Sequence, residues 1–236
     1  MSAERNARIR ALLDKRQPDL TVLLEEVHKP HNVAAIVRSC DAVGIHQIHG
    51  VWNNKNTVRK GTAVGSNMWV KSRGHATIND AVADLKSEGM QILVTNLSTK
   101  AVDFREVDYT RPTAIIMGQE KTGATAEAIA LADTDIIIPM VGMVQSLNVS
   151  VAAALVLYEA QRQRELAGMY NEPRLPEVER QRVLFEGGFP RLSKFCKEKA
   201  IANPHVSEDG EIIADDSWWE QLKLSKQAMR EIVADE

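Results

Sequence analysis

Short apolar runs alternate with amphipathic segments over the first two thirds of the chain. The apolar runs predict buried strands at residues 20–27, 45–52, 91–96, 113–117 and 134–139. The amphipathic segments between them predict helices at residues 32–43, 77–88 and 125–133. Strands that alternate with helices at these spacings are typical of an α/β fold, in which a parallel sheet is flanked by helices on both faces.

The helix predicted at residues 32–43 has a clear pattern. Its apolar positions follow the spacing i, i+3, i+4 and i+7, at Val33, Ile36, Val37 and Cys40. Asn32 can cap the first turn, because an asparagine side chain accepts a backbone N–H there, and Gly44 can end the helix. This prediction places Asn32 where a strand passes into a helix.

The two ends of the chain depart from the α/β pattern. Residues 3–16 predict a basic helix that ends before Gln17-Pro18, and further helices are predicted at residues 177–185 and 190–200. We therefore divide the chain into an N-terminal basic helix, an α/β domain, and a helical C-terminal extension with an acidic tail. Their bounds are residues 1–18, 19–168 and 169–236.

The most informative segment is residues 136–159, where a buried strand passes through a tight loop into a helix. Gln145, Ser146 and Asn148 stand at the helix entry, where parallel sheets expose backbone donors to ligands. One stripe of the helix is small and apolar, at Val149, Ala152, Ala153, Val156, Leu157 and Ala160. Such a stripe favours deep burial or a tight subunit contact, and an ordinary core helix explains it as well.

The net charge of the 236 residues is −3, which by itself argues against a nucleic-acid partner. Its distribution changes this picture. Residues 203–236 hold nine acids and three bases, a balance of −6, which leaves +3 for residues 1–202. Residues 53–75 contain five bases and no acid. These basic patches fit an RNA-binding enzyme with an acidic tail, and ordinary solvated surface explains them equally well.

No apolar run is long enough to cross a membrane, and the N-terminal segment MSAERNARIR lacks the apolar core of a signal peptide. We therefore expect a cytoplasmic protein with no membrane partner. Cys40 and Cys196 are the only cysteines, and we expect both to be reduced, buried thiols.

Several familiar motifs are incomplete. Residues 118–123, GQEKTG, look like a phosphate loop, but their lysine precedes the second glycine, whereas a Walker loop needs it afterwards. The chain has no Gly-x-Gly-x-x-Gly and no Gly-x-Ser-x-Gly. We expect no metal, because zinc-type partners are missing around His28, His31, His46 and His49. Residues 118–123 therefore predict a turn at a strand end, where Glu120 can face a ligand. In a plain loop, Glu120 would instead face solvent.

Arg38 lies on the helix predicted at residues 32–43, away from its apolar stripe. Such an arginine is usually only solvated. Two features favour a functional role: Asn32 stands at the start of the same helix, and the preceding His28-Lys29-Pro30-His31 forms a stiff turn without acids. Both residues are therefore candidates for a site.

Three ordered segments resemble the three motifs of the SpoU RNA methyltransferases, a family of the SPOUT superfamily. They are Asn32 with Arg38 six residues later, residues 116–123, and residues 136–159. Further similarity to members of the family that modify tRNA lies in the basic N-terminal helix and at residues 27–32, 65–69, 184–188 and 218–219. The resemblance covers nearly the whole chain. The three motifs in this order identify the family more specifically than any one motif does.

The resemblance implies transfer of a methyl group from S-adenosyl-L-methionine to the 2′-hydroxyl of guanosine 18 in the D-loop of tRNA. It implies a SPOUT catalytic domain at residues 19–168 with a deep trefoil knot near its C-terminal end, a homodimer, and tRNA binding by residues 1–18. By similarity, the cofactor is held by Thr95, Asn96, Leu97, Gly118, Ile138, Met140 and Leu147. The residues that act at the ribose are Asn32, Arg38, Glu120, Ser146 and Asn148. The candidates for phosphate contacts are Arg8, Arg10, Arg59, Lys60, Arg162 and Arg164.

A ribose hydroxyl is a weak acid, so catalysis depends on positioning it and on stabilising the developing alkoxide. The family's proposed role for the arginine is general base, but a guanidinium is essentially always protonated. We therefore expect Arg38 to stabilise the alkoxide or to hold a phosphate. Ser146 and Asn148 are expected to orient the ribose, and Glu120 to anchor Arg38 or a neighbouring loop.

Two other functions stay open. One is 2′-O-methylation of another tRNA position or of ribosomal RNA, since the motifs describe the donor and the ribose chemistry rather than the RNA. The other is a catalytically silent RNA-binding module, against which the joint presence of Arg38, Glu120, Ser146 and Asn148 argues.

Overall fold

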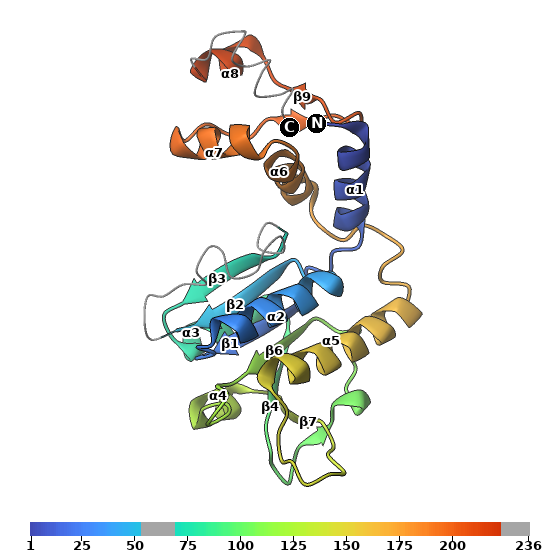
Figure 1. The fold of residues 1–236 in the computed structure, drawn as a ribbon, viewed down its shortest axis with the longest axis vertical. Coiled ribbons are helices and arrows are strands. Elements are labelled where there is room, and N and C mark those ends of the chain that lie inside the picture. The colour runs from blue at the N-terminus through green and yellow to red at the C-terminus, as the bar shows by residue number, and fades with distance from the viewer. Residues whose placement is uncertain (53–68, 223–236) are drawn as a thin grey trace. The chain divides into compact units, whose positions relative to one another are not determined.

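A computed structural model describes residues 1–52 and 69–222 (Figure 1). The chain forms two compact units. The α/β unit is Gln17–Glu172, and the terminal unit combines Met1–Arg16 with the chain from Pro173 onward.

Over its described residues, the α/β unit is built on one parallel sheet of seven strands, which confirms the predicted α/β fold class. The strands are β1 (Leu20–Glu25), β2 (Gln47–Val51), β3 (Lys71–His75), β4 (Gln91–Thr95), β5 (Val102–Asp103), β6 (Thr113–Met117) and β7 (Thr134–Ile137). Their order across the sheet is β3-β2-β1-β6-β4-β7-β5. Thr113 of β6 is in register with Leu20 of β1 and with Gln91 of β4. The carboxyl ends of these strands therefore meet at one edge, where parallel sheets bind ligands.

Helices cover both faces of the sheet (Figure 1). They are α2 (Pro30–Ala42), α3 (Ile78–Ser87), α4 (Ala126–Leu131) and α5 (Val149–Leu166), with a 3₁₀ turn η2 (Phe104–Glu106). Along β1, Val22 and Leu24 join the core under α2 and α5, whereas Leu23 joins the core under α3 and α4. Burial of both faces explains why the central strands are continuous apolar runs.

The stripe of small residues on α5 belongs to the core of its own chain. Its buried members are Val149, Ala153, Val156, Leu157 and Ala160. They pack in the cluster that α5 shares with α2, so the structure confirms deep burial for this stripe. On the outer side of the same helix, Val151, Leu155 and Tyr158 are 48%, 42% and 52% exposed.

The start of α2 differs from the sequence prediction. The helix begins at Pro30 with Lys29 as its N-cap, so Asn32 lies inside the first turn and the predicted Asn32 cap is wrong. Proline suits the first helical position, because its φ is already helical and its missing N–H needs no partner there. The side chain of Asn32 is therefore available for contacts outside the helix. Gly44, with φ of 83°, follows the helix end as predicted.

The apolar pattern does not predict β3. Its sequence, KSRGH, is polar, and among the described strands β3 lies at the sheet edge and pairs with β2. His75 of β3 shares a hydrogen bond of 2.8 Å with His49 of β2. Burial, together with the charges of His75 and Arg73, lowers the pKa of His49 to about 4, so this ring stays neutral.

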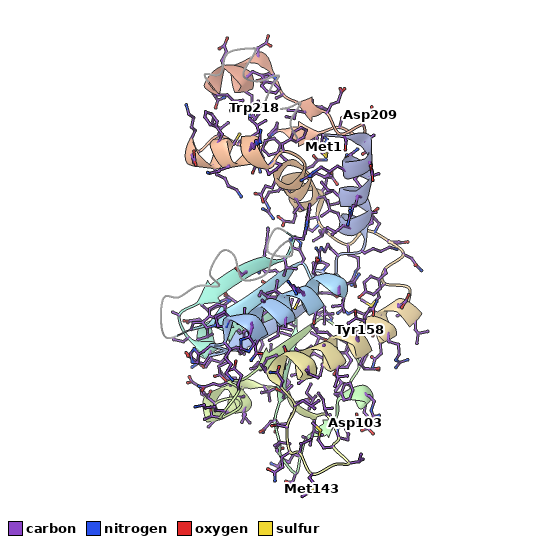
Figure 2. All side chains as sticks on the ribbon, viewed as in Figure 1. Met1, Asp103, Met143, Tyr158, Asp209 and Trp218 are labelled. Atoms are coloured by element: carbon purple, nitrogen blue, oxygen red, sulfur yellow. The ribbon has the colours of Figure 1, made fainter. Side chains whose placement is uncertain are left out.

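The terminal unit contains the helices predicted at both ends of the chain. Its elements are α1 (Ala3–Asp14), α6 (Glu177–Gly188), α7 (Pro190–Glu198), β8 (His205–Val206), β9 (Ile212–Ile213) and α8 (Asp216–Gln221). Phe185 is central to its core, with its ring centroid 5.8 Å from that of Phe189 and 6.3 Å from that of Trp218. Trp218 lies on α8 (Figure 2). Within residues 1–52 and 69–222, no helix has the length and apolar character needed to span a membrane.

Candidate active site

A cavity of about 320 Å³ lies at the carboxyl ends of β4, β6 and β7. Its wall comes mainly from residues 95–97 at the end of β4, residues 117–124 at the end of β6, and residues 136–138, 140 and 145–147 from the end of β7 to the start of α5. Its size falls in the usual range for small-molecule sites. The structure places all the residues predicted to hold a cofactor on this wall: Thr95, Asn96, Leu97, Gly118, Ile138, Met140 and Leu147.

Hydrogen bonds fix the strand ends beneath the cavity. The backbone N–H of Asn96 donates to the carbonyl of Ile136 at 3.1 Å, and its side-chain amide donates to Asp135 at 2.9 Å. The hydroxyl of Thr95 donates to the carbonyl of Ile116 at 3.4 Å. The end of β4 is therefore tied to both neighbouring strands.

The loop after β6 folds back on itself. The backbone N–H groups of Gln119 and Gly123 each donate to the other's carbonyl at 3.0 Å. Gly118 has no space for a side chain, because a Cβ there would lie 2.2 Å from the backbone nitrogen of Ala124. Gly123 has φ of 71°, a left-handed conformation that glycine adopts at little cost. The two glycines therefore close a tight turn that carries Glu120.

Glu120 binds the segment that enters α2. Its Oε1 accepts a hydrogen bond from Nδ2 of Asn32 at 2.8 Å and one from the backbone N–H of Lys29 at 3.3 Å. Oδ1 of Asn32 in turn accepts from Nδ2 of Asn148 at 3.2 Å. The chain Glu120–Asn32–Asn148 therefore joins the three motif segments. The Lys29 contact has no sequence signal, because it uses only the backbone.

The carboxylate of Glu120 stays ionised. Burial alone would raise its pKa, but the hydrogen bond from Asn32, the backbone donors and the charge of Lys29 together lower the pKa below its usual value. A carboxylate with a lowered pKa is a weak proton acceptor at neutral pH. Glu120 is therefore suited to hold Asn32 in place rather than to take a proton.

Asn148 is the N-cap of α5. Its Oδ1 accepts from the backbone N–H of Ser150 at 2.8 Å and from the Ser150 hydroxyl at 2.6 Å, which leaves Nδ2 to donate to Asn32. Ser146 lies on the cavity wall beside the same helix entry. The structure thus gathers four of the five predicted ribose residues at the carboxyl edge of the sheet: Asn32, Glu120, Ser146 and Asn148.

Arg38 stands apart from these four. It is exposed, and within the described ranges it forms no hydrogen bond or ion pair. Six helical positions separate it from Asn32, which places it roughly 120° around α2 and about 9 Å along the axis. Glu120 therefore anchors the segment at Lys29 and Asn32, and not Arg38.

The prediction of a phosphate contact at Arg164 is wrong. Its side chain is 0% exposed and forms an ion pair of 2.6 Å with Asp19. Its guanidinium also donates to Gln17 and to the carbonyls of Asp19, Tyr109 and Arg111. A planar group with several fixed donors can join segments in this way. Arg164 therefore holds the α/β unit together and is not accessible to RNA.

The predicted contact at Arg10 has a competing partner. The Arg10 guanidinium donates to Ser207 at 2.7 Å and to Asn6 at 3.2 Å, and it pairs with Glu208 at 3.3 Å. These bonds tie α1 to the segment after β8. A phosphate would have to replace the Glu208 pair, so the contact stays a prediction.

The other phosphate candidates also stay predictions. Arg8 is exposed on α1. Arg162 is 59% exposed and pairs with Glu159 at 2.7 Å. Arg59 and Lys60 lie outside the described residues. In the part of the chain that the structure describes, no three His, Cys, Asp or Glu side chains gather in a way that could hold a metal ion.

The fold and the cavity together define a parallel α/β protein that binds a small molecule at the carboxyl edge of its sheet. Comparison with known proteins makes this class specific. The sequence model of the SpoU rRNA methylase family matches residues 19–158, and the model of the C-terminal region of SpoU rRNA methylases matches residues 162–215. The chain belongs to the SpoU methylase family.

Individual relatives are similar over most of the chain. The tRNA (guanosine(18)-2′-O)-methyltransferase of Escherichia coli K12 is 62% identical over 228 residues, which are 95% of this chain and 100% of the relative. The crystal structure of the A. aeolicus TrmH/SpoU tRNA modifying enzyme matches with a TM-score of 0.73 and 45% identity, over 78% of this chain and 94% of that one. The SpoU methyltransferase AviRb from Streptomyces viridochromogenes, in complex with the cofactor AdoMet, matches with a TM-score of 0.53 and 30% identity, over 63% of this chain and 59% of that one.

Proposed function

We propose that this protein methylates the 2′-hydroxyl of guanosine 18 in tRNA, with S-adenosyl-L-methionine as the methyl donor. The 62% identity to the E. coli enzyme over 95% of this chain carries the proposal. The cavity at the sheet edge and the bonded chain Glu120–Asn32–Asn148 provide a site of the matching kind.

The cavity fits this cofactor. Ile138, Met140 and Leu147 give it an apolar wall, and Asn96 and Gln145 add polar groups. The turn at residues 118–123 is not a phosphate loop, in keeping with a cofactor that has no phosphate. When bound, S-adenosyl-L-methionine supplies a methyl group activated by a sulfonium centre.

The protein's own residues act on the ribose. Ser146 and Asn148, at the entry to α5, orient the ribose so that its hydroxyl oxygen is in line for the transfer. The Arg38 guanidinium stabilises the negative charge that develops on this oxygen, or holds an adjacent phosphate. It stays protonated throughout, and the hydroxyl proton leaves by another route.

The enzyme acts as a homodimer in this proposal, and Arg38 of one copy serves the site of its partner. The position of Arg38, turned away from Asn32, supports a site completed by a second copy. The outer face of α5 provides an apolar contact surface, formed by the exposed Val151, Leu155 and Tyr158. Figure 2 labels Tyr158 on this helix. Exposed apolar side chains grouped on one helix face are typical of an interface.

Leu155→Glu is expected to convert the dimer into a monomer, because a carboxylate is costly to bury in an apolar contact. Sedimentation equilibrium measures the mass directly. Val178→Glu is the matched control, since Val178 is also an exposed apolar residue, at 85%, but lies in the terminal unit. A dimeric Leu155→Glu protein would contradict the assignment of this face.

Membership of the SpoU family supports a deep trefoil knot near the end of the α/β unit. The helix within residues 1–18 contributes to tRNA binding, where Arg8 is exposed for a phosphate contact. The enzyme works in the cytoplasm on its tRNA substrate.

Methyl transfer to bulk unmodified tRNA, followed by mapping of the modified nucleotide, tests the proposal. We expect one 2′-O-methyl group, on guanosine 18. Modification at another tRNA position, or of ribosomal RNA alone, would show that the protein is a 2′-O-methyltransferase with a different RNA substrate. Binding of tRNA without methyl transfer would favour the silent RNA-binding module.

A further inference from the structure

We propose that Glu25 is a positioning residue for the cofactor, an inference that rests on the proposed function. Glu25 ends β1 and is only 3% exposed. A carboxylate loses its hydration on burial and persists there only with strong partners. No step of the proposed reaction uses it, so its partners indicate its role.

Both carboxylate oxygens of Glu25 bind one residue, Thr125. Oε2 accepts from the backbone N–H of Thr125 at 2.9 Å, and Oε1 accepts from the Thr125 hydroxyl at 2.6 Å. The hydroxyl oxygen of Thr125 accepts from the backbone N–H of Ala128 at 3.1 Å and so caps α4. Glu25 therefore fixes the point where the turn after β6 enters α4.

That turn forms one wall of the cavity. Gly118 and Ala124 are in close contact where the turn begins and ends, so a shift at Thr125 moves the wall at Gly118 as well. Residues 117–124 all line the cavity. By holding Thr125, Glu25 thus fixes the shape of the cavity wall at residues 117–124.

One short segment holds the turn at two places. Glu25 binds its base at Thr125, and Lys29 and Asn32 bind Glu120 near its tip. Between them, Glu26 has φ of 55°, a left-handed conformation that is strained for a residue with a side chain. Strain of this kind persists where the surrounding structure fixes it, and it often occurs at functional sites.

Glu25→Gln is expected to weaken binding of S-adenosylhomocysteine about tenfold. The NH₂ group of glutamine cannot accept a hydrogen bond, so one of the two donors of Thr125 loses its partner. Thr125→Ala, which removes the hydroxyl, should weaken binding by a similar factor, and Thr125→Ser should retain near-native affinity. The double variant should bind no more weakly than Thr125→Ala alone, because the two residues share one interaction. Affinity for tRNA should not change in any of them.

Calorimetric titration of the full-length variants with S-adenosylhomocysteine measures these effects, and thermal melts monitor folding. Glu127→Gln, at an exposed position of α4, is the control. If Glu25→Gln does not fold, the comparison of Thr125→Ala with Thr125→Ser decides, since Thr125→Ala keeps the backbone N–H that binds Oε2 of Glu25.

Unchanged S-adenosylhomocysteine affinity with a lowered melting temperature would overturn the proposal and leave Glu25 a purely structural role. A wild-type protein that binds S-adenosylhomocysteine but does not methylate guanosine 18 would refute the proposed function alone, and the Glu25 comparison would still hold. If the wild-type protein did not bind S-adenosylhomocysteine, both the role of Glu25 and the proposed function would be refuted.

Discussion

Replacing Arg38 by alanine is expected to lower kcat by about 100-fold or more, the usual effect of removing a group that stabilises transition-state charge. The KM for S-adenosyl-L-methionine should change little, because the charge on the ribose oxygen develops only in the transition state. The melting temperature should also stay the same, since Arg38 is exposed and makes no described hydrogen bond. Single-turnover methyl transfer to unmodified tRNA measures the effect.

Two further variants make this result specific. Arg105→Ala, which removes an exposed arginine paired with Asp103, should retain full activity. Arg38→Lys separates the two roles of the arginine. Near-native activity with a lowered apparent pKa in the pH–rate profile would show a proton-accepting role and contradict charge stabilisation.

Arg164→Met is expected to lower the free energy of unfolding by about 3–5 kcal/mol, the usual cost of removing one partner of a buried ion pair. The substitution removes the hydrogen bonds that Arg164 donates to the carboxylate of Asp19 and to the carbonyls of Tyr109 and Arg111. Chemical denaturation of the purified protein, monitored by circular dichroism, measures the loss.

Arg162→Met is the matched control, because Arg162 lies on the same helix and is 59% exposed. Its effect on unfolding should stay within about 0.5 kcal/mol, as for most surface substitutions. Equal stabilities of the two variants, with tRNA affinity lost only in Arg164→Met, would restore Arg164 as an RNA contact and contradict its structural role.

The secondary structure follows largely from local sequence signals. β6 occupies Thr113–Met117 as predicted, because a short apolar run between polar residues reports a buried strand. The helix predicted at residues 125–133 is α4, Ala126–Leu131, with Thr125 as its N-cap. β3 could not be predicted in this way, since an edge strand with polar residues on it has no apolar pattern.

The contacts of the site could not be derived from the sequence, because they are non-local. Glu120 and Asn32 are 88 positions apart, and Glu25 and Thr125 are 100 apart. The strand pattern predicts that such residues reach one sheet edge, but not which of them form bonds. Arg162 and Arg164 illustrate the same limit: they lie two positions apart on α5, and only the folded structure shows which one is buried.

In the proposed reaction, the 2′-hydroxyl of guanosine 18 accepts the methyl group. Two otherwise identical tRNA transcripts test it most directly, one with guanosine and one with 2′-deoxyguanosine at position 18. We expect methyl incorporation into the first transcript only, at the ribose of nucleotide 18. Equal incorporation into both transcripts would contradict it.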